Sequence, residues 1–186
     1  MPENKIDQVQ KALITKLERT VIGNPENKDV KMGALASKIQ VERVKKNVEL
    51  LMESQDKVFD NSQKLNLVDA SFEKGAFFSP VLFRNDEPFL KDAVHNIEAF
   101  GPVSTLIPYK NMEESLELVE MGKGSLVTSF VSNDDKKSKE FVVETAHTNG
   151  RILVLNSRCS KESTGHGSPM PQLSLIHISE PTRRRG

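Results

Sequence analysis

The most informative stretch of this chain is His95-Asn96-Ile97-Glu98-Ala99-Phe100-Gly101-Pro102-Val103. It places a glutamate and, two residues later, an aromatic residue directly before a Gly-Pro pair. Glycine permits backbone conformations that other residues avoid and proline restricts its own, so the pair marks a turn. The residues that follow, Val103-Ser104-Thr105-Leu106-Ile107-Pro108-Tyr109, are rich in β-branched and apolar side chains and predict a strand over 103–109. We therefore expect Gly101 and Pro102 to shape a turn that leads into this strand.

Helix and strand patterns alternate after this strand. Asn111 with Glu114 three residues later is close to a capping box and predicts the start of a helix. The resulting β-α-β-α-β order predicts parallel strands joined by right-handed crossovers, in a sheet that binds ligands at the carboxyl ends of its strands. The expected elements are a helix from Asn111 to Met121 that stops at Gly122, a strand over 125–131, a helix over 134–148 with Phe141, Val142 and Ala146 apolar and Gly150 at its end, and a strand over 151–155.

Two helices and a strand are predicted before the Gly-Pro turn. Apolar residues recur every four positions over 5–21, and the Asn24-Pro25 pair breaks that pattern. Ser37 is a good N-cap for a second helix that reaches Gln55. A strand is also predicted in the stretch 73–85, after the glycine at position 75. The apolar stripes of the two helices are Val9, Leu13, Leu17 and Val21 in the first, and Ile39, Val44, Val48 and Leu51 in the second.

Composition excludes several classes of protein. The 26 basic and 26 acidic residues balance, which argues against a surface for nucleic acid or an anionic membrane. No apolar run approaches 18 residues, and the polar start of the chain argues against a secretory signal. Cys159 is the only cysteine, so no disulfide can form within the chain, which fits a reducing cytoplasm. The four histidines are scattered without metal-ligand spacing, so no metal site is expected.

Several short blocks resemble the aldehyde dehydrogenase superfamily, over roughly residues 2–172. Glu98 to Val103 is similar to the Glu-x-Phe-Gly-Pro-Val signature of that family. Each of the other blocks is weak alone, but together their order and spacing are specific. These blocks are Ile22-Gly23-Asn24-Pro25, Met32-Gly33-Ala34-Leu35, Gln40 with Arg43, Gly75-Ala76-Phe77-Phe78-Ser79-Pro80, and Leu155-Asn156.

The resemblance implies an α/β fold like the aldehyde dehydrogenase catalytic domain, with an open, mostly parallel sheet, flanking helices and an incomplete architecture. It also implies that Glu98 holds the ribose next to the nicotinamide of NAD or NADP, and that Phe100 flanks the nicotinamide ring. We expect the fold to be shared over residues 1–172. Within that span, Gly101 and Pro102 are expected to shape the backbone rather than to touch the ligand.

The family chemistry that the resemblance implies is acyl transfer to sulfur. A cysteine thiolate attacks the aldehyde, a hydride leaves to the nicotinamide, and a water activated by a glutamate hydrolyses the thioester. The family places that cysteine and that glutamate before the segment seen here, so we expect no catalytic residue in this chain and no turnover by it alone. A dinucleotide-binding domain is not expected either, because no Gly-x-Gly-x-x-Gly follows a strand.

One branch of the family matches more closely. The wording from His95 to Thr105, and again from Glu162 to Pro169, resembles the aldehyde dehydrogenase domain that acts in phenylacetate breakdown. This branch implies a small-molecule aldehyde as substrate, specifically a CoA-linked semialdehyde, with NADP favoured over NAD. It also implies a homo-oligomer of the parent protein, while the composition predicts a cytoplasmic location with neither nucleic acid nor membrane as partner. An acylating enzyme that ends in transfer to CoA stays open as a further possibility.

Two other interpretations compete with the enzyme fragment. A truncated paralogue without catalysis would bind partner subunits, as an oligomerisation or regulatory module. Single residues also invite catalytic labels, namely Cys159 as a nucleophile and Ser163, His166 and Ser168 as a hydrolase constellation. We assign neither, because Cys159 lies far past the family's nucleophile position and no Gly-x-Ser-x-Gly elbow is present.

The segment from Leu173 to Gly186 resembles nothing in the family. It is similar to translated adapter or assembly read-through sequence, and we expect it to be artefactual and disordered and leave it out of the fold. The alternative is a natural short tail with a basic end. The predicted domains are therefore a partial catalytic domain over 1–172 and an unrelated tail over 173–186.

Overall fold

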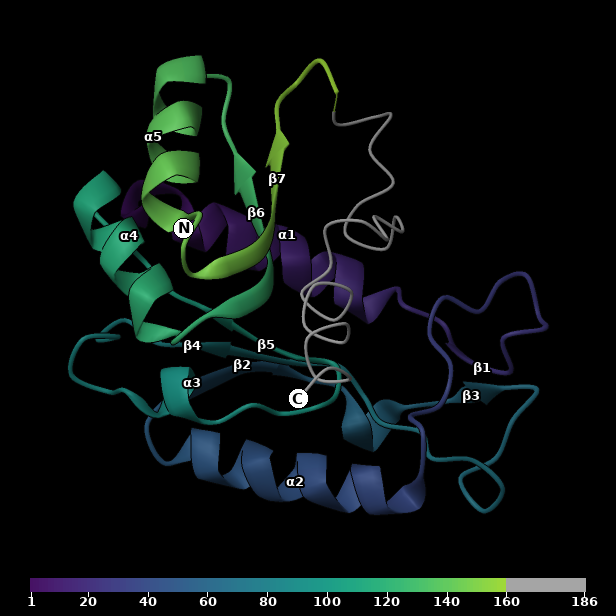
Figure 1. Cartoon of the computed structure of the whole chain (residues 1–186). Helices are drawn as coiled ribbons and strands as arrows, with labels where there is room; N and C mark the ends of the chain where they lie inside the picture. Colours follow the sequence, from purple (N-terminus) through teal and green to yellow (C-terminus); the bar gives the residue numbers. More distant parts are fainter. Residues whose placement is uncertain (160–186) are drawn as a thin grey trace, which may run out of the picture. The chain divides into compact units, whose positions relative to one another are not determined.

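The computed structural model describes residues 1–159 of the chain. The chain divides into two compact units, Met1–Lys110 and Asn111–Gly186, and their elements are labelled in Figure 1. The predictions made for residues 160–172, and for the tail over 173–186, lie outside the described residues. Each unit is described by itself below.

The first unit is built on a three-stranded sheet in the order β2-β4-β5. Strand β4 runs antiparallel to β2 and parallel to β5, with Val81 opposite Val103 and Arg84 opposite Leu106. A separate parallel pair joins β1 to β3. The elements are η1 (Glu3–Lys5), α1 (Ile6–Glu18), β1 (Ile22–Gly23), α2 (Lys38–Met52), β2 (Asp56–Asp60), η2 (Ser62–Lys64), β3 (Leu67–Val68), β4 (Val81–Arg84), α3 (Ala93–Asn96) and β5 (Val103–Leu106).

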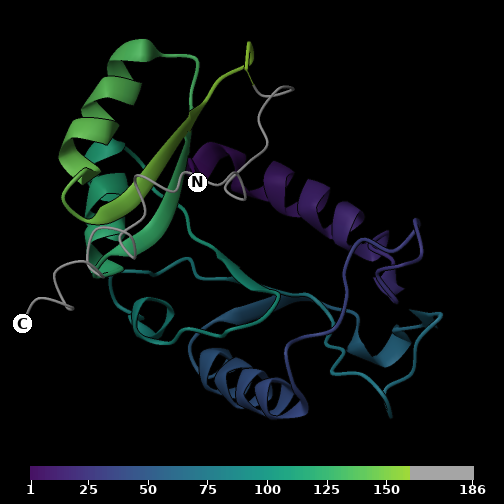
Figure 2. The same cartoon turned by 45° about the vertical axis from the view of Figure 1, so that its right-hand side comes forward.

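Helices α1 and α2 cover opposite faces of this sheet (Figures 1 and 2). The reason lies in β4, where successive side chains point to opposite faces. Val81 and Phe83 pack with the buried residues of α2, whereas Leu82 packs with Ile6 at the start of α1. Phe83 is completely buried. The first unit therefore has two small cores, one on each face of the sheet.

The second unit pairs two parallel strands, β6 (Ser125–Val131) and β7 (Asn149–Leu155), with two helices, α4 (Met112–Met121) and α5 (Asp135–Thr145). Ser125 lies opposite Asn149, and Val131 lies opposite Leu155. The ring of Phe141 on α5 stacks on that of Phe130, with ring centroids 4.3 Å apart. This stacked pair fixes α5 against the strands, because Phe141 is the large apolar residue that the helix buries.

Several sequence predictions are confirmed. The Ser37 hydroxyl accepts a hydrogen bond from the backbone N–H of Gln40 at 3.1 Å and caps α2. The Asn111 side chain does the same for the N–H of Glu114 at 2.8 Å, and α4 ends at Met121 as predicted. The strand over 125–131 has the predicted bounds. The α/β fold with mostly parallel strand pairing also agrees with the structure.

The predicted helix ends were too late in three cases. Helix α1 ends at Glu18 rather than at 21, and α2 ends at Met52 rather than at Gln55. Helix α5 ends at Thr145 because the Asn149 side-chain amide donates to the Thr145 carbonyl at 3.0 Å, and this bond terminates the helix four residues before Asn149. Gly150 does not end that helix, since it lies inside β7.

Two side chains of the predicted apolar faces turn outward. Ile39 was placed in the buried stripe of α2, but 68% of it is exposed, and Ala146 is exposed as well. For Ile39 the reason is its angle on the helix. It lies one residue before Gln40, away from the stripe formed by Val44, Val48 and Leu51.

The predicted strands were too long where proline intervenes. Of residues 73–85 only Val81–Arg84 form a strand, because Pro80 has no N–H to donate to a neighbour. Strand β5 ends at Leu106, two residues before Pro108. The predicted β-α-β-α-β sheet is also divided, since β5 belongs to the first sheet and β6 and β7 form another. Strand β2 was not predicted at all, because its residues Asp56–Asp60 are mostly polar.

Candidate functional site

The segment 97–101 runs beside α2 with alternating exposure. Ile97 has an extended backbone and packs on the core under α2, and Ala99 is half-buried. Glu98, between these two residues, is exposed, and so is Phe100, which follows Ala99 and is 68% exposed. Glu98 and Phe100 are thus left to solvent, while Ile97 and Ala99 are partly covered. Both of the residues predicted to hold the cofactor are therefore accessible to a ligand.

Three residues of α2 hold the backbone of this segment. The Gln40 side-chain amide donates a short hydrogen bond to the Phe100 carbonyl, and the Asn47 amide donates to the Glu98 carbonyl at 2.9 Å. Between these two bonds, Val44 packs against Gly101. A Cβ at Gly101 would lie only 2.8 Å from Cγ2 of Val44. Gln40, Val44 and Asn47 follow the i, i+4, i+7 spacing of one helix face, so they contact the segment as a row.

The turn also ties the segment to the sheet. The N–H of Gly101 donates to the Ala99 carbonyl at 2.6 Å, and the N–H of Val103 donates to the Gly101 carbonyl at 2.8 Å. One residue earlier, the Pro102 carbonyl accepts from the N–H of Val81 at 2.9 Å, which begins the pairing of β4 with β5. The backbone on both sides of Phe100 is therefore anchored, as the Gly-Pro pair predicts.

The exposed pair has unused binding capacity. Among the described residues, the Glu98 carboxylate takes part in no hydrogen bond or ion pair, so its two oxygens are open to a ligand. An ionised carboxylate only accepts hydrogen bonds, which suits two neighbouring hydroxyl groups. The Phe100 ring adds an apolar face beside them. This arrangement fits a sugar joined to a flat ring.

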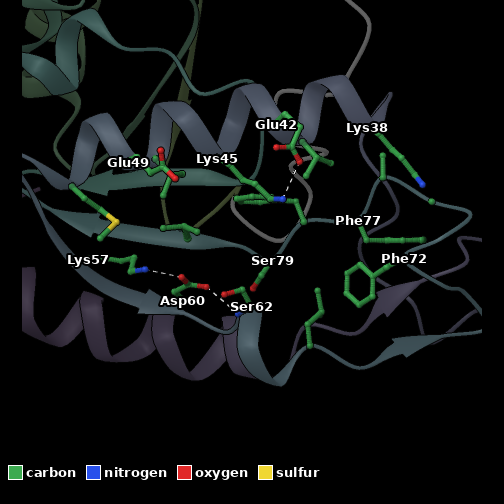
Figure 3. A pocket seen from close by; sticks show the side chains of 18 residues that line it. Lys38, Glu42, Lys45, Glu49, Lys57, Asp60, Ser62, Phe72, Phe77 and Ser79 are labelled. Carbon is green, nitrogen blue, oxygen red and sulfur yellow. Dashed lines mark hydrogen bonds and ion pairs between the residues drawn. The ribbon is translucent and has the colours of Figure 1, made fainter.

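A groove of about 650 Å³ lies along the other flank of α2 (Figure 3). It includes neither Glu98 nor Phe100. Ion pairs cross its wall, with Lys45 Nζ 2.9 Å from Glu42 Oε1 and Lys57 Nζ 2.8 Å from Asp60 Oδ2. Burial raises the pKa of Asp60, but hydrogen bonds from Lys57 and Ser62 outweigh it, so the pKa lies below its usual value.

Phe72 and Phe77 are two of the apolar residues that line the groove, and their rings meet edge to face with centroids 6.4 Å apart (Figure 3). At its rim, the Lys38 ammonium donates to the Glu73 carbonyl at 2.6 Å. All of the lysines that line this groove therefore have partners. The groove is a surface feature of the first unit, separate from the predicted cofactor residues.

The remaining candidates lie elsewhere or outside the structure. Cys159 follows β7 in the second unit, where its Sγ accepts from the N–H of Asn156 at 3.3 Å. Ser163, His166 and Ser168 lie outside the described residues. Over residues 1–159, no three His, Cys, Asp or Glu side chains gather as metal ligands. In the same part of the chain, no helix has the length and apolarity needed to span a membrane.

Comparison with known proteins identifies the family. The sequence pattern of the "Aldehyde dehydrogenase family" matches residues 1–164. The chain belongs to the aldehyde dehydrogenase family. Its fold is found in betaine aldehyde dehydrogenase from Staphylococcus aureus, solved as a double mutant in complex with NAD+. That structure has a TM-score of 0.70 and 20% identity, with 82% of this chain and 30% of that chain covered.

Relatives and further structures place this chain within the family. "Protein MaoC" from Klebsiella aerogenes is 42% identical over 142 residues, which are 76% of this chain and 41% of the relative. "3,4-Dehydroadipyl-CoA semialdehyde dehydrogenase" from Aromatoleum evansii is 33% identical over 94% of this chain and 33% of its own length. An aldehyde dehydrogenase from Bacillus cereus shares the fold with a TM-score of 0.69 and 22% identity, over 82% of this chain and 29% of that chain. The chain thus spans well under half of the relatives that it matches.

Sequence reasoning missed Asn47. It identified Glu98, Phe100 and the position of Gln40, but it gave Asn47 no role. The signal was present in the helix periodicity, because Asn47 is seven residues after Gln40 and lies on the same face. A polar residue on the same helix face as the apolar Val44 would have predicted a hydrogen bond to a neighbouring segment.

Proposed function

We propose that this chain forms the nicotinamide-ribose side of the cofactor site of an NAD(P)-dependent aldehyde dehydrogenase. The observation that carries the proposal is the exposed pair Glu98 and Phe100, on a segment whose backbone is bound to α2. The Glu98 carboxylate accepts hydrogen bonds from two ribose hydroxyls, and Phe100 covers one face of the nicotinamide. When bound, the cofactor supplies the acceptor for the hydride that leaves the aldehyde.

The two residues act by orientation and by exclusion of water. A carboxylate with two ribose contacts fixes the rotation of the sugar, and the sugar carries the nicotinamide with it. Phe100 removes water from one face of the ring, which leaves the other face for the aldehyde. The structure of the relative solved with NAD+ supports the cofactor class. We propose NADP over NAD on the resemblance of the sequence alone.

We propose that the substrate is a CoA-linked semialdehyde of phenylacetate breakdown, oxidised to its acid. The name of the Aromatoleum relative, a CoA-semialdehyde dehydrogenase, supports this class over an unconjugated aldehyde. The parent enzyme is proposed to be a cytoplasmic homo-oligomer. An acylating enzyme would use the same cofactor residues. It would differ in forming NADPH only when CoA is added together with the aldehyde.

We assign no catalytic nucleophile to this chain. Cys159 is its only cysteine, and its sulfur is engaged in the turn after β7. The isolated chain is therefore proposed to bind cofactor without turnover. NADP+ and a CoA-linked semialdehyde should give no rise in nicotinamide absorbance with the pure protein. A steady rise proportional to protein concentration would contradict this part of the proposal.

The cofactor contact can be measured with Phe100→Trp. The chain has no tryptophan, so this substitution introduces a single fluorescent reporter at the proposed contact. We expect titration with NADPH to quench its emission by energy transfer to the nicotinamide. A matched reporter at the exposed Phe72→Trp in the groove should respond much less. Equal responses at the two positions, or none at Phe100→Trp, would reject the proposed contact.

A non-catalytic oligomerisation module remains the second candidate function. Apolar side chains exposed on the second unit favour it, in particular Val131 at 74%, Val143 at 70% and Leu126 at 53%. Light scattering separates the two. A stable oligomer with no quenching of the Phe100→Trp reporter favours the module, whereas quenching favours the cofactor site in either state of assembly.

A further inference from the structure

We infer that Asn47 is a positioning residue of this site, which sets the direction of the Glu98 carboxylate by holding the carbonyl of the same residue. The inference rests on the proposed function. Its geometric basis is the hydrogen bond of 2.9 Å from the Asn47 amide to the Glu98 carbonyl. Asn47 does not touch the cofactor in this role. It acts through Glu98.

The bond acts on the residue whose side chain must be directed. The carbonyl and the side chain of Glu98 are joined through the same Cα, so a bond that fixes the direction of the carbonyl also restricts the direction in which the side chain leaves the backbone. The neighbouring contact at Phe100 works in the same way, because Gln40 holds that carbonyl. Two amides seven residues apart on one helix therefore fix two alternate residues of the segment. Val44, which lies between the two amides on the helix and is 1% exposed, packs against Gly101.

An amide is the suitable group at position 47. It donates without adding charge, whereas a lysine would form an ion pair with Glu98 and occupy the carboxylate. A carboxylate at position 47 offers only acceptors and would repel the Glu98 carbonyl. Asparagine is also short, so few rotatable bonds must be ordered to make the contact. The Glu98 carboxylate is left without a partner among residues 1–159 and open to the ligand.

The benefit of such a contact is preorganisation. A segment fixed before binding loses less conformational freedom when the ligand arrives, so the ligand binds more tightly without any new contact. Loss of the Asn47 bond should therefore weaken binding of the nicotinamide half of the cofactor by about three- to tenfold, the range expected for one net hydrogen bond.

The test is a double-mutant cycle on the full chain, with Asn47→Leu, Glu98→Ala and both together. Calorimetric titration with NAD+ and nicotinamide mononucleotide gives the affinities. Hydrogen exchange of the amides over 97–103 reports the segment without any ligand. Lys46→Leu is the matched control, because Lys46 is the neighbouring exposed residue of α2 and has no role in the site. Thermal unfolding of every variant monitors the fold.

If Asn47 acts through Glu98, Asn47→Leu weakens nicotinamide mononucleotide but adds no further loss in the Glu98→Ala background. Full additivity of the two losses would overturn the inference in favour of a general structural role. Asn47→Asp keeps the size but not the donor, so it should weaken nicotinamide mononucleotide at least as much as Asn47→Leu. Retained affinity in Asn47→Asp also overturns the inference.

Failure of the proposed function has a different signature. If the unmodified chain binds neither NAD+ nor nicotinamide mononucleotide, the proposed cofactor contact is rejected, and hydrogen exchange alone judges Asn47. Faster exchange over 97–103 in Asn47→Leu, with unchanged exchange in Lys46→Leu, supports the holding contact. Unchanged exchange in both variants overturns it.

Discussion

The two flanks of α2 meet their neighbours in different ways. On one flank, Gln40 and Asn47 bond to backbone carbonyls, and Val44 fills the space that Gly101 leaves. On the other, Glu42 and Lys45 pair only with each other, and their side chains are 71% and 56% exposed. On the second flank, water can solvate Glu42 and Lys45 if their ion pair is lost. On the first flank, water cannot restore the close packing between Val44 and Gly101.

This difference indicates which face of α2 is sensitive to substitution. A backbone carbonyl cannot swing aside, so a contact to it depends on position to a fraction of an ångström. An exposed ion pair contributes little, because water solvates both charges after separation. Substitutions should therefore have large effects toward the segment 97–101 and small effects toward the groove.

The largest effect is expected for Gly101→Ala. The new Cβ would lie 2.8 Å from Cγ2 of Val44, which is buried and stiff as a β-branched residue in a helix. We expect a loss of about 1–3 kcal/mol in the free energy of unfolding, as for other overpacked sites. Denaturant unfolding measures this loss, provided that the dependence of the unfolding free energy on denaturant concentration is the same in the variant.

A cycle with Val44→Ala identifies the cause. The smaller side chain leaves room for the new methyl group, so the double variant should lose clearly less than the sum of the single losses. Gly33→Ala is the matched control, since its Cβ would meet nothing closer than 3.9 Å. Simple additivity at 101 and 44, or an equal loss at 33, would contradict the close packing.

A smaller, pH-dependent effect is expected for Asp60→Asn in the groove. The pKa of Asp60 is lowered in the folded protein, since hydrogen bonds from Lys57 and Ser62 outweigh its burial. Its ionisation therefore contributes stability above the unfolded pKa, and this contribution is lost as the pH falls through the lower folded value. The difference between the protein and Asp60→Asn should be below about 1 kcal/mol at neutral pH and should shrink below about pH 4.

The pH dependence has its own control. Lys57→Met removes the ammonium that bonds to Asp60, so the further change to Asp60→Asn should become nearly independent of pH. Unfolding midpoints between neutral and acidic pH would show it. A difference that grows toward acid would reverse the sign of the linkage and reject the assigned cause.

The smallest effect is expected for the pair Glu42 and Lys45. Replacing either by alanine should change the free energy of unfolding by less than about 0.5 kcal/mol, and salt should reduce this further. Lys46→Ala, next to the pair and exposed, sets the baseline. A loss above that of Gly101→Ala would erase the contrast between the two flanks.

Local chemistry made much of the fold predictable. Ser37 and Asn111 cap their helices because short polar side chains accept from the free N–H groups of a first turn, a contact within four residues. The Gly-Pro turn and the strand over 125–131 are likewise local. Glu98 and Phe100 were predicted as a pair through their family signature; both are exposed, and their role at the cofactor stays a prediction.

Other features depend on residues far apart in the chain. Strand β2 is mostly polar, and its pairing with β4 defines it as a strand. Gln40, Val44 and Asn47 gain their contacts only when the segment 97–101 packs beside them. That segment lies much later in the sequence, as the separation of 51 positions between Asn47 and Glu98 shows. The groove is likewise made of α2 together with residues 57–81.

The sequence by itself therefore determined the caps, the turn, the family and the two residues proposed for the cofactor. Each of these is set within a few residues by backbone geometry and hydrogen-bonding groups. Only the tertiary structure decided what holds those two residues in place. The bonds from Gln40 and Asn47 join parts of the chain that are held together by the burial of Val44, Val81 and Phe83 in one core.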